Sequence, residues 1–156
     1  MKGFTPVFEN ILDQGSILVQ SQPTMDIDEG LYKSAFEASR NPEIKMVIWV
    51  CYQHIPMELV KILKDMGLDY NAISHKIWFI DMISDIMGLI DQEENITFCS
   101  NPTDYSCIMR TIDEKIDKFG KCLIIIDSLN GISSYDQSER FIKIIRNLNN
   151  KVSQKR

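Results

Sequence analysis

Two stretches of the chain are continuously apolar and do not alternate between apolar and polar residues. They are "KMVIWVCY" (45–52) and "KCLIIID" (121–127). Strands that are covered on both faces show this pattern, which is typical of a mostly parallel sheet with helices on either side. Three further stretches are strand candidates: "SILVQS" (16–21), "KIWFID" (76–81) and, as a weaker case, "ITFCS" (96–100).

Apolar residues at helical spacing characterise the segments between these strands. Two of the segments end in a glycine, Gly67 or Gly120, which is a common helix stop. Because strands and helices alternate with short connections, the pattern predicts βαβ units. We therefore expect a single α/β domain over residues 1–156, a three-layer α/β/α structure whose residues 151–156 form a frayed tail. The helical segments cover residues 31–38, 56–68, 105–120 and 139–148.

The composition limits the classes of function. The 156 residues are 44% hydrophobic and 25% charged, as in ordinary globular proteins, and the net charge is −5. This charge disfavours a general attraction to nucleic acid or to an anionic membrane. The sequence opens without a secretory signal, and its apolar runs are shorter than the roughly 20 residues that span a bilayer. These features predict a cytoplasmic protein that does not associate with membranes.

Four cysteines are present: Cys51, Cys99, Cys107 and Cys122. None forms a CxxC pair, and two of them lie inside apolar runs, so we expect small core residues in a reducing compartment. His54 and His75 lie in different segments without a partner at ligand spacing, which disfavours a histidine-based metal site.

The stretch "LIIIDSLNG" (123–131) is the most informative for chemistry. An apolar strand that ends in Asp127 and is followed by Ser128 places a carboxylate at the edge where open α/β sheets bind ligands. In nucleotide-hydrolysing proteins of this design such an aspartate holds Mg²⁺. The alternative is that Asp127 caps the turn that follows it. A second turn, "NPTDY" (101–105), predicts that Thr103 or Asp104 caps the next helix.

Five stretches in order resemble the KaiC-like branch of the RecA superfamily of P-loop ATPases. They are "GSILVQSQP", "VIWVCYQHIPMELVKILKDMGLD", "IWFIDMIS", "NPTDYSCIM" and "CLIIIDSLNGISSY", and the resemblance covers about residues 10–148. It implies a RecA-like fold with a nucleotide site between the ends of the first strand and of the strand that carries Asp127. The family continues with at least one more strand between these two. We therefore expect a domain that is shortened at its C-terminus, in which the two strands pair directly or a partner completes the sheet; a fragment of a longer domain would give the same sequence pattern.

The phosphate-binding motif of the family is degenerate in this chain. When the family's turn is anchored on Pro23, residues Thr24, Met25 and Asp26 occupy the positions of the loop glycines. Ile27 then stands at the position of the catalytic lysine, and Asp28 at that of the Mg²⁺-binding hydroxyl. Triphosphate binding needs backbone amides that approach closely and a cation at the β- and γ-phosphates. This junction supplies neither.

The water-activating position of the family is also altered, because Gln53 and His54 replace a pair of glutamates after the second strand. The two side chains could line a pocket or form an exposed pair on the surface. Of the catalytic set only Asp127 remains, with Ser128 beside it. We therefore expect no catalytic residues and a weak, degenerate nucleotide site made of Asp127 and Ser128, with Thr24, Asp26, Asp28, Gln53 and His54 around them.

The acidic junction between the first strand and its helix has two interpretations. In the first, "DIDE" is a capping box, with Asp26 as N-cap and Glu29 reaching back to the amide of the cap. In the second, Asp26 or Asp28 joins Asp127 in a divalent-metal site, since hard cations prefer oxygen ligands. At about 4 Å, each contact between a carboxylate and a phosphate costs about 1 kcal/mol in water and about 4 kcal/mol at an effective dielectric constant of 20. Ordinary P-loop binding of ATP is therefore disfavoured under both interpretations of the junction.

Together these features predict a KaiC/RecA-like protein that is catalytically inactive, needs no cofactor and acts as a binding or regulatory module. The alternative is an atypical nucleotide- or metal-binding ATPase that uses Asp127 and, in that case alone, ATP and Mg²⁺. The resemblance also implies side-by-side assembly, and a shortened sheet leaves an edge that needs covering. We therefore expect a homo-oligomer or a protein partner.

Overall fold

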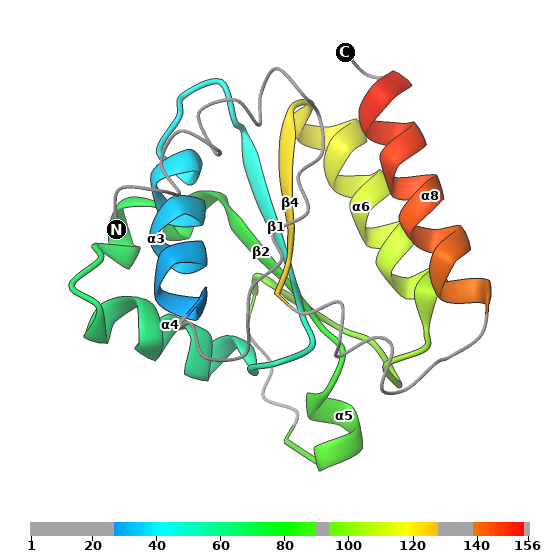
Figure 1. Cartoon of the computed structure of the whole chain (residues 1–156), viewed down its shortest axis with the longest axis horizontal. Helices are drawn as coiled ribbons and strands as arrows, with labels where there is room; N and C mark the ends of the chain where they lie inside the picture. Colours follow the sequence, from blue (N-terminus) through cyan, green and yellow to red (C-terminus); the bar gives the residue numbers. More distant parts are fainter. Residues whose placement is uncertain (1–26, 90–93, 128–138, 155–156) are drawn as a thin grey trace.

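The structure of the chain, a computed structural model, describes residues 27–89, 94–127 and 139–154 (Figure 1). Its centre is a sheet of four strands, all parallel, in the order β3-β2-β1-β4. The predicted α/β class and parallel sheet are therefore confirmed. The strands are β1 (Met46–Cys51), β2 (Ile77–Asp81), β3 (Ile96–Phe98) and β4 (Cys122–Ile126).

Strand β1 lies in the middle of the sheet, paired with β2 on one side and with β4 on the other. All six of its residues are buried, which explains why "MVIWVC" is apolar without interruption. Val47, Trp49 and Cys51 face one hydrophobic cluster, and Met46, Ile48 and Val50 face the other.

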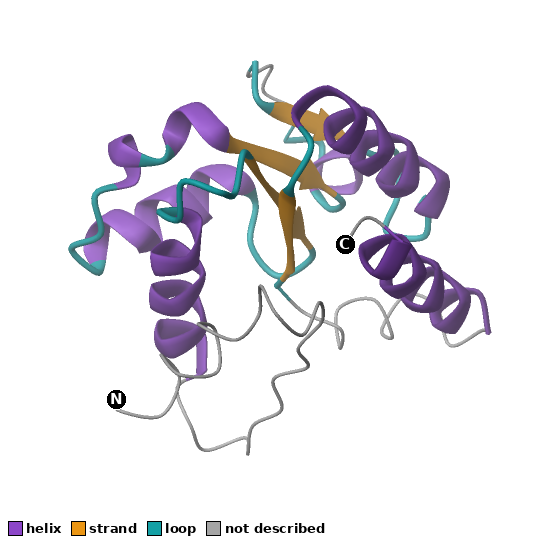
Figure 2. Cartoon of the chain, turned by 90° about the horizontal axis from the view of Figure 1, so that it is seen from above, coloured by secondary structure: helices purple, strands orange, loops and turns teal. Residues whose placement is uncertain are grey.

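Helices cover both faces of the sheet, which gives the expected three layers (Figure 1 and Figure 2). Helices α3 (Ile27–Ser39) and α4 (Pro56–Asp65) contribute to the cluster around Trp49, while α6 (Tyr105–Phe119) and α8 (Glu139–Gln154) contribute to the cluster around Ile48. Among the described residues, no helix is both long and apolar enough to cross a membrane.

Three short elements are not indicated by the hydrophobic pattern: η1 (Tyr70–Ala72), η2 (Ser74–Lys76) and α5 (Ser84–Met87). Each has four residues or fewer, which is too short for a helical periodicity to be visible in the sequence. The two predicted glycine stops are confirmed, because Gly67 and Gly120 follow α4 and α6 with φ of 77° and 83°. Other residue types rarely adopt this left-handed conformation.

Several predicted features lie outside the described residues: the strand at 16–21, the junction up to Asp26, and Ser128. Ile27, the first described residue, already belongs to helix α3, so the predicted cap at Asp26 stays a prediction. The predicted strand at 16–21 and the single domain over residues 1–156 both stay predictions.

Cys99 and Cys107 are buried core residues as expected, but they are not the reduced thiols that were predicted, because they form a disulfide. Cys99 follows β3 and Cys107 lies in the first turn of α6. The turn between them reverses the chain and brings their Cα atoms to 5.9 Å. The two cysteines are eight positions apart, a spacing that is not a CxxC pair and does not by itself predict a disulfide. Cys51 is a buried free thiol as expected, and Cys122 is half-buried.

Candidate functional site

The carboxyl ends of β2, β1 and β4 meet at one edge of the sheet, which is the usual ligand edge of an open α/β fold. Two buried carboxyl groups lie there. Asp81 ends β2 and is 1% exposed, and Asp127 follows β4 and is 7% exposed. The register places Cys51, the last residue of the intervening β1, opposite Asp81. The predicted position of Asp127 at this edge is therefore correct.

The carboxylate of Asp127 holds the turn that leads from β1 into α4. Its Oδ1 accepts hydrogen bonds from the amides of Tyr52 (2.8 Å) and Gln53 (3.2 Å). Its Oδ2 accepts from the amides of Gln53 (3.1 Å) and His54 (3.5 Å). These contacts are long-range, because the three amides precede Asp127 in the chain by more than 70 residues. They differ from the predicted contact, in which Asp127 would cap the turn that follows it.

Burial raises the pKa of Asp127 to about 6. The hydrogen bonds from the amides of Tyr52, Gln53 and His54 and the charge of His54 act in the opposite direction and lower it. Desolvation is therefore the dominant effect on this carboxyl group. Burial, together with the negative charges of Asp127 and Asp81, also raises the pKa of Cys51 well above its usual range. Cys51 is consequently a neutral, unreactive thiol at pH 7.

Gln53 and His54 lie beside Asp127 through their backbone, and their side chains differ in exposure. Gln53 is exposed and His54 is partly buried. The His54 ring packs edge-on against Tyr32, and its Nδ1 lies 3.8 Å from Oε2 of Glu58. The sequence therefore correctly placed Gln53, His54 and Asp127 at one edge of the sheet. It did not reveal that the main chain makes the contact.

The other predicted site residues are not brought to Asp127 by the described part of the chain. Thr24, Asp26 and Ser128 lie outside it, and Asp28 lies in the first turn of α3 with a side chain that is not described. The proposed pairing of Asp28 with Asp127 stays a prediction. Within residues 27–89, 94–127 and 139–154, no three His, Cys, Asp or Glu side chains are grouped as metal ligands.

The hydrogen bonds of Asp127 bear on its predicted role as a ligand of Mg²⁺. An ionised carboxylate has about four lone-pair sites. Three amides of the turn at 52–54 make four contacts with its two oxygens, because the amide of Gln53 is shared between Oδ1 and Oδ2. A cation at Asp127 would compete with these hydrogen bonds, which hold the start of α4.

Asp81 is a residue of the edge that the sequence analysis did not single out. Its Oδ1 accepts from the amides of Ile83 (3.0 Å) and Ser84 (2.9 Å), and its Oδ2 accepts from the hydroxyl of Ser84. The signal was present, because "KIWFID" ends an apolar strand in aspartate just as "KCLIIID" does.

A groove with a volume of about 290 Å^3 runs beside α4, on the face of the sheet that α3 and α4 cover. Met57, Val60 and Lys64 of α4 line one side, and Phe79 and Phe98 of the sheet contribute to its lining. Its lining is mixed, because Lys64, Asp81, Ser84 and Asn95 contribute beside the apolar residues. Four exposed hydrophobic residues lie on α4 and in the α5 region: Met57, Ile86, Met87 and Leu89.

The comparison with protein families gives one match that covers more than half of the chain. The family model described as "ATPase: KaiC" matches residues 39–156. The matched part contains the turn at 52–54, the disulfide and Asp127, and does not include the junction at 24–28. No curated protein and no solved structure is similar enough to the chain to give a significant match. With its parallel α/β sheet and this match, the chain belongs to the KaiC family of ATPases.

Proposed function

We propose that this KaiC-like domain does not hydrolyse ATP and acts as a binding or regulatory module. The observation that carries the proposal is the engagement of Asp127. Its carboxylate accepts four hydrogen-bond contacts from the turn at 52–54 and serves as a structural anchor for the start of α4. An aspartate used in this way is poorly placed to hold the metal of a nucleotide.

Two sequence features support the same proposal. Gln53 and His54 replace the acidic pair that activates water in the family, and an exposed glutamine cannot act as a general base. The positions of the loop glycines and lysine carry Thr24, Met25, Asp26 and Ile27. The second departure removes the phosphate-binding parts that phosphoryl transfer requires, and the first removes the carboxylates that activate water in the family.

The test is a calorimetric titration of the full chain with ATP and Mg²⁺, combined with an assay of phosphate release. We expect neither saturable binding nor release above the buffer rate. The variant Ile27→Lys should not restore either, because the loop glycines remain absent. Magnesium-dependent phosphate release by the wild type that is lost in Asp127→Asn would contradict the proposal.

The alternative, an atypical nucleotide- or metal-binding enzyme, is favoured by one observation. A buried carboxyl group with a pKa of about 6 at a ligand edge is typical of acids and bases in active sites. In that case Mg²⁺, Mn²⁺ or Ca²⁺ would raise the melting temperature of the wild type but not that of Asp127→Ala. An equal response of both proteins to all three ions would exclude Asp127 as the ligand.

We also propose that a second copy of the chain or another protein covers the groove beside α4. Of the five large hydrophobic residues that the described part of the chain leaves exposed, Met57 and Leu89 line the groove, and Ile86 and Met87 lie in the neighbouring sequence of α5. Concentrated apolar exposure of this kind is typical of interaction sites. The fifth, Ile142 of α8, provides a matched control.

Light scattering at several concentrations tests this association. The wild type should form an oligomer, and Leu89→Ser should lower its mass, whereas Ile142→Ser should not. A monomeric wild type would exclude self-association and leave another protein as the expected partner. A cytoplasmic location also stays a prediction, and the disulfide makes it worth testing by fractionation, because disulfides are uncommon in that compartment.

A further inference from the structure

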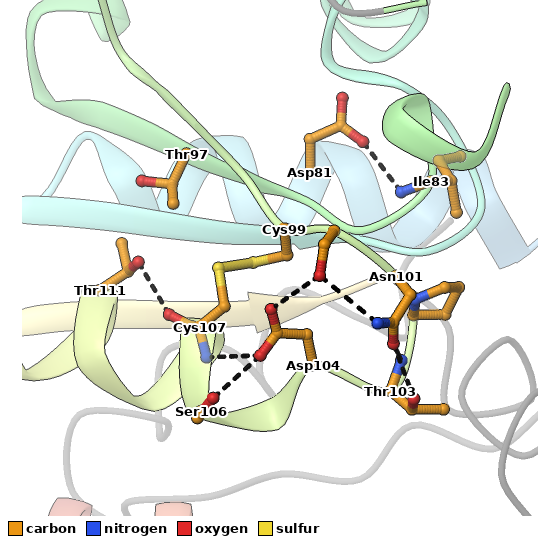
Figure 3. The surroundings of a disulfide bond; sticks show 12 residues. Asp81, Ile83, Thr97, Cys99, Asn101, Thr103, Asp104, Ser106, Cys107 and Thr111 are labelled. Atoms are coloured by element: carbon orange, nitrogen blue, oxygen red, sulfur yellow. Dashed lines mark hydrogen bonds between the residues drawn. A yellow bond between two sulfur atoms is a disulfide. The ribbon is translucent and has the colours of Figure 1, made fainter. Parts of the chain in front are cut away.

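The disulfide closes a compact turn between β3 and α6 (Figure 3). Both cysteines are buried, with exposures of 1% for Cys99 and 3% for Cys107. Asp104 caps α6, because its carboxylate accepts from the amide of Cys107 and from the hydroxyls of Ser100 and Ser106. Of the two predicted candidates for this cap, Thr103 and Asp104, the structure has Asp104. The hydrogen bonds of the Asp104 side chain stay within residues 100–107, so they order the turn without attaching it to the rest of the site.

A hydrogen bond from Tyr52 connects this turn to the site at Asp127. The hydroxyl of Tyr52 donates to the carbonyl oxygen of Pro102 at 2.8 Å, and both residues are buried. The amide of the same Tyr52 donates to Oδ1 of Asp127 at 2.8 Å. Tyr52 therefore bonds to the disulfide turn with its side chain and to Asp127 with its backbone.

We propose that the Cys99–Cys107 disulfide is a redox-controlled latch, which in its oxidised state holds Pro102 against Tyr52 and so keeps the turn at 52–54 on Asp127. The latch would act on the geometry of the edge whether the site binds a nucleotide, a metal or a protein, so the inference goes beyond the proposed lack of ATPase activity.

The reaction is a thiol–disulfide exchange with a dithiol as the reductant. One thiolate of the dithiol attacks a sulfur of the disulfide, and the second thiolate then closes a ring and releases the protein as two thiols. Two electrons and two protons pass to Cys99 and Cys107, and the dithiol leaves as a cyclic disulfide. Because both sulfurs are buried, exchange needs a local opening of the turn, which makes it slow relative to exchange at an exposed disulfide.

We expect reduction to displace the turn, because the core around the two sulfur atoms is closely packed and cannot expand to hold two thiols. Two thiols need more space than a disulfide, and close-packed cores absorb extra volume poorly. Cys99 and Cys107 both belong to the hydrophobic cluster that includes Ile108 and Ile112. The amide of Cys99 is also bonded to the carbonyl of Asp81 at 2.9 Å, which anchors that end of the turn to β2. The segment around Pro102 is then the part that moves, and the bond from Tyr52 is the contact that it loses.

Hydrogen exchange of the full chain, resolved by residue, tests the latch. The oxidised protein is compared with the protein in excess dithiothreitol and with the double variant Cys99→Ser/Cys107→Ser. We expect the amides of Tyr52, Gln53 and His54 to exchange about tenfold faster when the disulfide is absent, since a hydrogen bond that holds them is weakened. Reoxidation of the wild type should restore the slow rates.

The variant Tyr52→Phe separates the latch from a general loss of stability, because it removes the hydroxyl and keeps the disulfide. Its amides at 52–54 should already exchange fast when oxidised, and reduction should add nothing. The amide of Trp49 in β1 is the internal control and should keep its rate in every state. Unchanged rates at 52–54 after reduction would overturn the latch. So would an equal acceleration at Trp49, because the effect would then be global. The reduced wild type keeps the test decisive if the double variant does not fold.

Discussion

Two aspartates end two apolar strands of the same sheet, and they stabilise the fold in different ways. Asp81 accepts hydrogen bonds from Ile83 and Ser84, which follow it by two and three positions. Asp127 accepts from Tyr52, Gln53 and His54, which precede it by 75, 74 and 73 positions. The first contact orders a local turn, and the second joins β4 to the start of α4.

The difference shows that one sequence pattern can have a local and a long-range outcome. A local contact involves a short stretch of chain and can form with little ordering of the rest of the protein. The contact of Asp127 exists only when β1 and β4 are paired, so it depends on the complete sheet. Breaking it should therefore cost more than breaking the contact of Asp81, and its effect should depend on pH.

Replacing Asp127 with alanine should have the largest effect, a loss of about 3–4 kcal/mol in the free energy of unfolding at pH 7. Each amide that loses its buried acceptor costs about 1–3 kcal/mol, and removal of a buried charge offsets part of that sum. Urea unfolding of Asp127→Ala and of the wild type measures the difference. A loss below that of Asp81→Ala would contradict the long-range role of Asp127.

The pH dependence of stability should be the next largest effect. The pKa of Asp127 is about 6 in the folded protein and about 3.8 in the unfolded chain, so the folded state binds more protons between these values. The contribution of Asp127 is therefore most favourable below about pH 4, falls as the pH rises to about 6 and is constant above about pH 7.

The shift corresponds to a change of roughly 2–3 kcal/mol. Urea unfolding between pH 4 and pH 7 measures it as the difference in unfolding free energy between the wild type and Asp127→Asn, in which this group does not titrate. A difference between the two proteins that is the same at all pH values would contradict the raised pKa.

Replacing Asp81 with alanine should cost about 0.5–2 kcal/mol, because the hydrogen bonds that are lost are local and the short segment can rearrange to expose its amides to water. The residues that lose their acceptor, Ile83 and Ser84, begin a helix of only one turn, and α5 exposes Ile86 and Met87 to solvent. Thermal unfolding of Asp81→Ala and of Asp81→Asn, which keeps one acceptor oxygen, should show the larger loss for alanine. Equal losses would mean that burial of the side chain matters more than its hydrogen bonds.

Removing the hydroxyl of Tyr52 should have the smallest effect, about 0.5–1.5 kcal/mol, because a single hydrogen bond to the carbonyl of Pro102 is lost. Urea unfolding of Tyr52→Phe in the oxidised and in the reduced protein measures it. The loss should be smaller in the reduced protein, where the turn at Pro102 is already released. An equal loss in both states would indicate that Tyr52 and the disulfide act independently.

The hydrophobic pattern of the sequence was sufficient to predict the four described strands and the four long helices, because continuous burial and helical spacing are local properties. Gly67 and Gly120 as helix stops, and a helix cap at either Thr103 or Asp104, were predicted for the same reason. Asp127 was predicted to lie at the ligand edge because an aspartate after a buried parallel strand must lie there. The family was indicated by the order of several motifs, and the matching family model confirms it.

Contacts between distant segments were decided only by the tertiary structure. The sequence does not show that the carboxylate of Asp127 faces the amides of residues 52–54, because this depends on the pairing of β1 with β4. It also does not show that Cys99 and Cys107 meet, because their distance depends on the angle at which α6 leaves the turn after β3. The pKa of Asp127 follows from the same packing, since desolvation exists only once the sheet and its helices exclude water.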